Sequence, residues 1–188
     1  MTNMSSFVRV LATICLPFVL VITFVGTASA HYTSDHRTNL YTWHTSSNIP
    51  SSWDQALMNG VLGWDNVTNQ CHDFVRVATG AGQIPQWRGT IDGAGQQTIY
   101  AITTFNHNNI EYDTAEPWHL NTGTSPGGSS LDLWSVAAHE NGHTLALIHS
   151  STSAETMFAT YGYGRSDWRT LESGDRTRIR ALYPPGSC

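Results

Sequence analysis

The stretch LDLWSVAAHENGHTLALIH, residues 131–149, decides the fold prediction. It contains no proline and a single glycine, and Leu133, Val136 and Leu145 supply apolar surface for packing. The preceding residues, 121–130, are rich in Gly, Ser and Thr and are expected to form a loop. The sequence therefore predicts that a helix over 131–145 follows this loop.

Two histidines of this helix are spaced to bind one metal ion. His139 and His143 lie one turn apart on the same face, so both imidazoles can reach the same point, and His149 follows six residues later. A zinc ion in a hydrolase has three protein ligands and one open position for water. Three neutral ligands leave the ion its full charge, so its water ionises near neutral pH.

Glu140, beside the first histidine, is the candidate general base that takes a proton from this water and passes it to the leaving amine. Two other interpretations are a helix with surface histidines and a closed structural zinc site. A closed site needs a fourth ligand; none lies nearby in the sequence, although His119 could fold back. A structural site also has no use for Glu140, which favours the catalytic interpretation.

The first thirty residues have the pattern of a secretory signal. Arg9 is the only charged residue there, an apolar run covers 10–25, and Ala-Ser-Ala at 28–30 forms a small-x-small cleavage site. The alternative is a membrane anchor, but the run is shorter than the roughly 20 residues that span a bilayer. We expect a secreted, extracellular chain with no stable membrane anchor, whose residues 31–188 form one domain.

The charge of the chain limits the partners it can bind, and its cysteines indicate whether it carries a disulfide. The chain has 9 basic and 14 acidic side chains and a formal net charge of −5, which argues against a nucleic-acid partner. Beyond the signal segment, Cys71 and Cys188 are the only cysteines, and an even pair in an exported chain predicts one disulfide. Two free thiols are the alternative.

The other elements are predicted from shorter patterns. Trp53, Leu57, Val61 and Trp64 line one face of a helix that starts after Pro50, with a serine hydroxyl as N-cap. A last helix is expected to end at 183, capped by Thr170 or Ser173. The glycines between 78 and 97 indicate loops. Strands are expected at 37–43, 73–78, 97–105 and 110–112.

The run from His139 to His149 resembles the metzincin consensus HExxHxxGxxH, and its surroundings resemble the matrixin branch, the matrix metalloproteinases and their microbial relatives. Ser150, Met157 and the final Leu-Tyr at 182–183 stand where matrixins have similar residues. The resemblance implies a secreted zinc endopeptidase of the microbial type. It also implies an α+β fold, one metzincin-like domain with a twisted, mixed, five-stranded sheet and three helices, in which the strand at 97–105 borders the cleft.

The resemblance also assigns roles to single residues. Met157 would form a hydrophobic floor under the zinc, with ordinary packing in the core as the alternative. Tyr161 would stand in the wall of the pocket that receives the residue after the scissile bond. Asp92, Asp113 and Glu116 match acidic positions that bind calcium in matrixins; solvated loop acids are the equally weighted alternative. Protein or peptide substrates and a monomeric state are expected.

Two departures from the family pattern stand out. Ala146 replaces the glycine at which the helix turns toward the third ligand, and a left-handed backbone there would cost alanine roughly 1–2 kcal/mol. Only six residues, 31–36, separate Ala30 from the first predicted strand, so no cysteine-switch propeptide is expected. The competing function is a non-catalytic extracellular binding module that keeps the zinc; the presence of Glu140 speaks against it.

Overall fold

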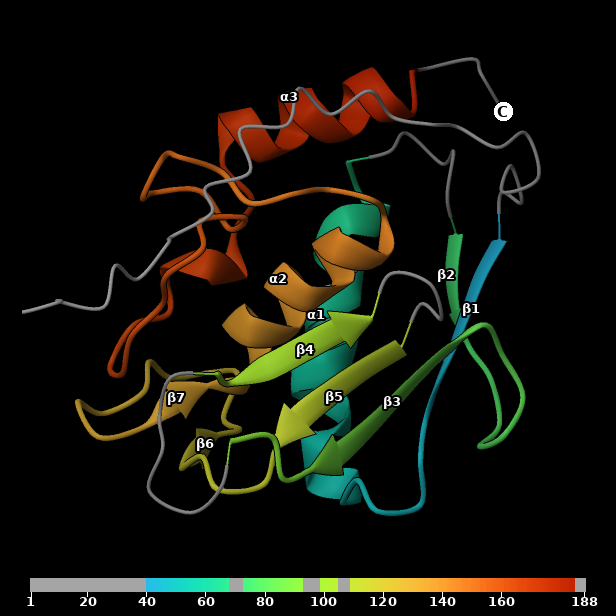
Figure 1. Ribbon diagram of the computed structural model, residues 1–188, viewed down its shortest axis with the longest axis vertical. Helices are drawn as coiled ribbons and strands as arrows, with labels where there is room; N and C mark the ends of the chain where they lie inside the picture. Colours follow the sequence, from blue (N-terminus) through green and yellow to red (C-terminus); the bar gives the residue numbers. More distant parts are fainter. Residues whose placement is uncertain (1–39, 68–72, 93–98, 105–108, 185–188) are drawn as a thin grey trace, which may run out of the picture. The chain divides into compact units, whose positions relative to one another are not determined.

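The computed structural model describes residues 40–67, 73–92, 99–104 and 109–184 (Figure 1). The predicted α+β fold is confirmed: a mixed five-stranded sheet is combined with three α-helices. The predicted signal segment and both cysteines of the predicted disulfide, Cys71 and Cys188, lie outside the described residues.

The five strands lie in the order β2-β1-β3-β5-β4. Three parallel pairings join β2 (Asp73–Arg76) to β1 (Leu40–Thr45), β1 to β3 (Ile84–Gly89), and β3 to β5 (Asn109–Asp113). β4 (Ala101–Thr104) runs antiparallel to β5 at one edge of the sheet. A separate parallel pair is formed by the two-residue strands at 118–119 (β6) and 131–132 (β7).

The third strand was not predicted, because the glycines on either side of it indicated loops. Its sequence, IPQWRG, also contains Pro85, which lacks the N–H that a central strand normally donates. In the structure Pro85 lies opposite His44 of β1, and the next residues pair with β5. Pairing on both sides therefore overrides the local composition.

The three helices are α1 (Asp54–Asp65), α2 (Leu133–Thr144) and α3 (Ser173–Leu182), with short 3-10 turns at 51–53 (η1) and 167–169 (η2). The predicted serine and threonine caps are wrong. No side chain caps α1, since the 3-10 turn already supplies its first turn. Asp132 caps α2 by accepting from the Ser135 N–H, and Glu172 caps α3. No helix among the described residues is long and apolar enough to cross a membrane.

The helix α1 packs directly against α2 (Figure 1). The predicted apolar face is confirmed, because Trp53, Leu57, Val61 and Trp64 are all buried. A side chain at Gly60 would come within 2.7 Å of Ala137, so glycine there allows the two helices to approach closely. The Trp64 indole also donates to the Ala138 carbonyl over 2.7 Å. These contacts fix the helix that carries His139 and His143.

Candidate active site

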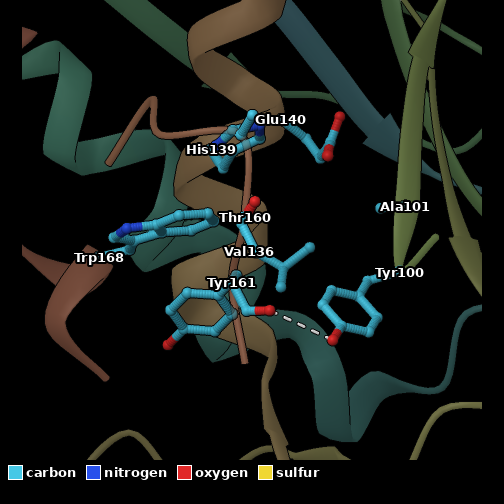
Figure 2. Close-up of a pocket in the computed structure, with 9 residues that line it drawn as sticks. Tyr100, Ala101, Val136, His139, Glu140, Thr160, Tyr161 and Trp168 are labelled. Carbon is cyan, nitrogen blue, oxygen red and sulfur yellow. Dashed lines mark hydrogen bonds between the residues drawn. The ribbon is translucent and has the colours of Figure 1, made fainter. Parts of the chain in front are cut away.

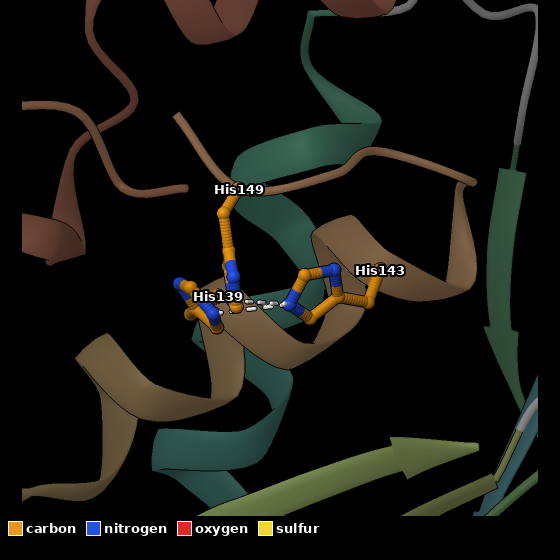
Figure 3. A group of neighbouring side chains, drawn as sticks. All are labelled: His139, His143 and His149. Carbon is orange, nitrogen blue, oxygen red and sulfur yellow. Dashed lines mark hydrogen bonds between the residues drawn. The ribbon is translucent and has the colours of Figure 1, made fainter. Parts of the chain in front are cut away.

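The three predicted ligand histidines come together at one point (Figure 3). Nε2 of His143 lies 3.1 Å from Nε2 of His139 and 3.2 Å from Nε2 of His149. Nitrogens bound to one tetrahedral zinc ion at about 2.0–2.1 Å lie roughly 3.3–3.4 Å apart. The three rings therefore fit a zinc ion with three nitrogen ligands.

The opposite nitrogens of two rings are held by backbone carbonyls. Nδ1 of His139 donates to the Thr156 carbonyl, and Nδ1 of His143 donates to the Leu147 carbonyl, each over 2.7 Å. A carbonyl only accepts, so Nδ1 carries the proton and Nε2 keeps its lone pair for the metal. Burial also lowers the pKa of His139 and of His143 to about 4, which keeps both rings neutral. This is the form in which imidazole binds zinc.

The chain reaches the third histidine through a left-handed turn. Ala146 has a φ of +64°, the only positive φ of a non-glycine residue in the described part of the chain. The Leu147 N–H bonds back to the Gly142 carbonyl over 3.1 Å, which closes the end of α2. Ala146 therefore has the left-handed backbone at which alanine, in place of the family's glycine, is costly. His149 follows on an exposed segment, in contrast to the buried His139 and His143.

Glu140 is buried and lies at the boundary between α2 and β4. The hydroxyl of Thr103 lies 2.6 Å from its Oε2 atom. Burial raises the pKa of Glu140, while the neighbouring His143 and the hydrogen bond from Thr103 act in the opposite direction. Both Glu140 and His139 line a cavity of about 330 Å³, so the carboxylate is available to a bound molecule.

Aromatic and small residues form the rest of this cavity (Figure 2). Trp168 stacks on Tyr161 at 4.2 Å between ring centroids and on His139 at 4.8 Å. The Tyr100 hydroxyl donates to the Tyr161 carbonyl over 3.2 Å. This bond joins the loop that contains Tyr161 to the residue that precedes β4. The other lining residues are Ala101, Val136, Ala159 and Thr160.

The matrixin family profile matches residues 44–184, which include the three histidines, Glu140 and the cavity. The chain belongs to the matrixin family. It is 31% identical to human matrix metalloproteinase-26 over 144 residues, which are 71% of this chain and 52% of that protein. Rat stromelysin-2 is 29% identical over 70% of this chain and 28% of its own length. Human matrix metalloproteinase-20 is 38% identical over 39% of this chain and 14% of its own. The chain thus spans at most about half of these matrixins.

Met157, predicted as the floor of the matrixin zinc site, lies fully buried against α2. A side chain at Gly142 would collide with the Met157 sulfur and would come within 2.7 Å of the Trp64 ring. Glycine between the two helical histidines therefore leaves room for this methionine below them.

The three predicted calcium ligands differ in burial. Asp113 and Glu116 are buried, whereas Asp92 is half-buried. Burial, and the charges of Asp113 and Asp92, raise the pKa of Glu116, while a hydrogen bond from Tyr163 lowers it. Among the described residues, only the three histidines bring three ligand atoms within 4.8 Å of one another. Calcium binding stays a prediction.

Sequence reasoning missed most of the cavity lining of the matrixin site, Trp168 included, and it missed Thr103, which contacts Glu140. Trp168 comes from the three-residue 3-10 turn η2, which is too short for a periodic pattern to indicate which side chains point inward. Thr103 lies two residues after Ala101 on β4, so the alternation of a strand places both on the face toward α2. That alternation was the available signal. The predicted strand, 97–105, was placed beside the cleft, but the sequence prediction did not assign which of its faces points inward.

Proposed function

We propose that this domain is a zinc-dependent endopeptidase. The observation that carries the proposal is the convergence of three Nε2 atoms beside Glu140, in a cavity open to a substrate. A zinc ion held there would polarise the scissile carbonyl and make a water molecule acidic enough to ionise near neutral pH.

The protein residues account for the rest of the reaction. Glu140 takes a proton from the attacking water and delivers it to the nitrogen of the leaving amine. The cavity beside His139, with Tyr161 in its wall, receives the side chain that follows the scissile bond. Within the described sheet β4 pairs with β5 alone, so an extended peptide can add to its other edge. Such binding favours unfolded or flexible protein substrates.

The deciding experiment compares cleavage of denatured casein by the wild-type chain and by Glu140→Gln, each with and without a zinc chelator. We expect the variant to bind zinc normally but to lose activity by at least about 100-fold, because general base catalysis contributes on that order. Equal activity in both proteins would refute the role of Glu140. Zinc binding without cleavage under any condition would favour the competing function, a non-catalytic binding module.

Secretion and a disulfide are further parts of the proposal, supported by the sequence. We infer that the chain is exported and cut after Ala30, and that Cys71 pairs with Cys188. The N-terminal sequence of the secreted protein tests the first, and its mass before and after alkylation without reductant tests the second. Mature protein that begins elsewhere, or takes up two alkyl groups, would refute the respective inference. The microbial type of the chain and the absence of a propeptide stay predictions.

A further inference from the structure

Thr103 is a buried residue of the edge strand β4 that contacts Glu140 across the interface with α2. Its Oγ1 atom lies 2.6 Å from Oε2 of Glu140 and 3.1 Å from the backbone carbonyl oxygen of Glu140. Figure 2 shows the Glu140 carboxylate directed toward the ribbon of β4. A threonine of the sheet therefore reaches both the side chain and the backbone of the candidate base.

The two oxygens of the Glu140 carboxylate are in different environments. Oε2 accepts the Thr103 hydroxyl, while no hydrogen bond to Oε1 is present within the described residues. Because Glu140 lines the cavity, Oε1 is the oxygen available to a water molecule there. The hydrogen bond thus fixes Oε2 and leaves Oε1 to act as the proton acceptor.

We propose that Thr103 is a positioning residue that holds Oε2 of Glu140, so that Oε1 stays aimed at the attacking water. The proposal rests on the proposed peptidase function. It adds to that function a residue of β4, which acts on the general base Glu140 and not on the metal ion.

The Glu140 side chain is long, and its carboxylate can turn unless another group holds it. Glutamate has three rotatable bonds, and the last of them has no sharply preferred angle, so an unheld carboxylate samples many orientations. Threonine is branched at Cβ and stiff about χ1, and Thr103 is fixed further by pairing of β4 with β5 opposite Ile110. A charge-assisted hydrogen bond from this rigid donor restricts the carboxylate at little entropic cost.

The second acceptor of Thr103 allows the same residue to act throughout the reaction. Its hydroxyl has one hydrogen, which the shorter contact assigns to Oε2 while Glu140 is ionised. After Oε1 has taken the proton from water, the carboxyl group is neutral and a weaker acceptor. The hydroxyl can then remain on Oε2 or rotate to the Glu140 carbonyl at 3.1 Å, so no donor is left unpaired.

The test uses the zinc-loaded secreted chain and a quenched peptide built from a cleavage site found in denatured casein. Thr103→Val removes the hydroxyl and keeps the shape, and Thr103→Ser keeps the hydroxyl. Thr104→Val is the matched control, because Thr104 is the next residue on the same strand but is exposed. We expect Thr103→Val to lower kcat about tenfold or more with KM changed less than about twofold, and the other two variants to stay within about threefold of wild type.

Each result decides the proposal. A Thr103→Val protein that binds zinc and keeps its kcat, or a loss that Thr104→Val shares, overturns it. So does a change in KM alone. If the valine variant does not fold, Thr103→Ser and Thr103→Ala replace it, since they differ only in the hydroxyl. Equal kcat in that pair overturns the proposal.

A second measurement does not depend on activity. In a double-mutant cycle on thermal unfolding, Thr103→Val is introduced into the wild type and into Glu140→Ala. We expect Thr103→Val to lower the Tm in the first background and to change it much less in the second. Equal shifts in both would show that the two side chains are not coupled and would overturn the proposal. A coupled pair in a wild-type protein that binds zinc and cleaves nothing would instead identify the peptidase function as the part that fails.

Discussion

At the scale of single residues, one alanine bears the backbone strain of the turn to the third zinc ligand. Ala146 has a φ of +64°, a conformation in which Cβ of an L-residue crowds its own backbone at a cost of roughly 1–2 kcal/mol. Its neighbours Leu145 and Leu147 are both buried, and the Leu147 N–H bonds to Gly142. Packing on both sides of Ala146 therefore maintains a conformation that alanine itself disfavours.

Ala146→Gly should stabilise the protein. Relief of roughly 1–2 kcal/mol of strain is partly offset by the roughly 0.4–1 kcal/mol that glycine adds to the entropy of the unfolded chain, so a net gain of about 0.5–1 kcal/mol is expected. Chemical denaturation of the zinc-loaded protein measures it. Ala154→Gly is the control, because Ala154 is exposed and has no positive φ; it should lose about 0.4–1 kcal/mol. A loss in both variants would show that Ala146 is not strained.

At the scale of elements, α3 supports the zinc site without contacting the metal ligands. The fully buried Asp175 in its first turn accepts hydrogen bonds from the backbone N–H groups of Thr156 and Met157, at 2.8 and 3.2 Å. The carbonyl of the same Thr156 holds the ring of His139. Arg178, one turn further along α3, pairs with Asp175 at 3.1 Å. Thus α3 is joined through one peptide segment to the first ligand.

Asp175→Asn should weaken both the fold and the metal site. The amide cannot accept as many hydrogen bonds, and it leaves Arg178 without part of its ion pair, so a loss of about 3 kcal/mol in unfolding free energy is expected. Because Thr156 orients His139, zinc affinity should fall about 10- to 100-fold in a competition titration. Asp167→Asn, which removes an exposed partner of Arg165, should cost less than about 1 kcal/mol. Equal losses in the two variants, or unchanged zinc affinity in Asp175→Asn, would contradict this link.

The elements also show which parts of the structure could be predicted from the sequence. The helix α2 and its two histidines, His139 and His143, follow from spacing within five residues, because a helix converts that spacing directly into one face. The hydrogen bonds from the Thr156 N–H to Asp175 and from the Thr103 hydroxyl to Glu140 join residues 19 and 37 positions apart, so no local pattern contains them. Strand β3 was missed for a related reason, since its pairing with β1 and β5 and not its composition makes it a strand.

At the scale of the whole domain, α2 is the element through which the others meet. It contacts α1 on one side, β4 and β5 of the sheet on another, and the η2 turn that carries Trp168. Arg169 of that turn pairs with the buried Asp132 at the start of α2 over 2.6 Å. A zinc ion on His139, His143 and His149 would tie the chain beyond α2 to this same helix. Metal binding and global stability should therefore be linked.

Zinc removal should lower the stability of the entire domain. An ion present at about 1,000 times its Kd stabilises the folded state by about 4 kcal/mol, and in a domain of this size that corresponds to a Tm shift of about 10 °C. Differential scanning calorimetry with EDTA, followed by addition of zinc alone or calcium alone, measures the two metals separately. Zinc should restore most of the lost Tm in the wild type and none in His143→Ala.

The calcium arm of the same calorimetric experiment tests the acidic residues. Oδ2 of Asp113 and Oε1 of Glu116 are buried and have no hydrogen-bond partner within the described part of the chain. Since unpaired buried carboxylate oxygens are costly, a hard cation is expected to raise the Tm by binding them. Addition of calcium should therefore raise the Tm of wild type but not of Asp113→Asn. An unchanged wild-type Tm in millimolar calcium would show that the two carboxylates do not bind calcium and serve the fold alone. If calcium alone restored all of the Tm lost in EDTA, that result would contradict the link between zinc binding and folding.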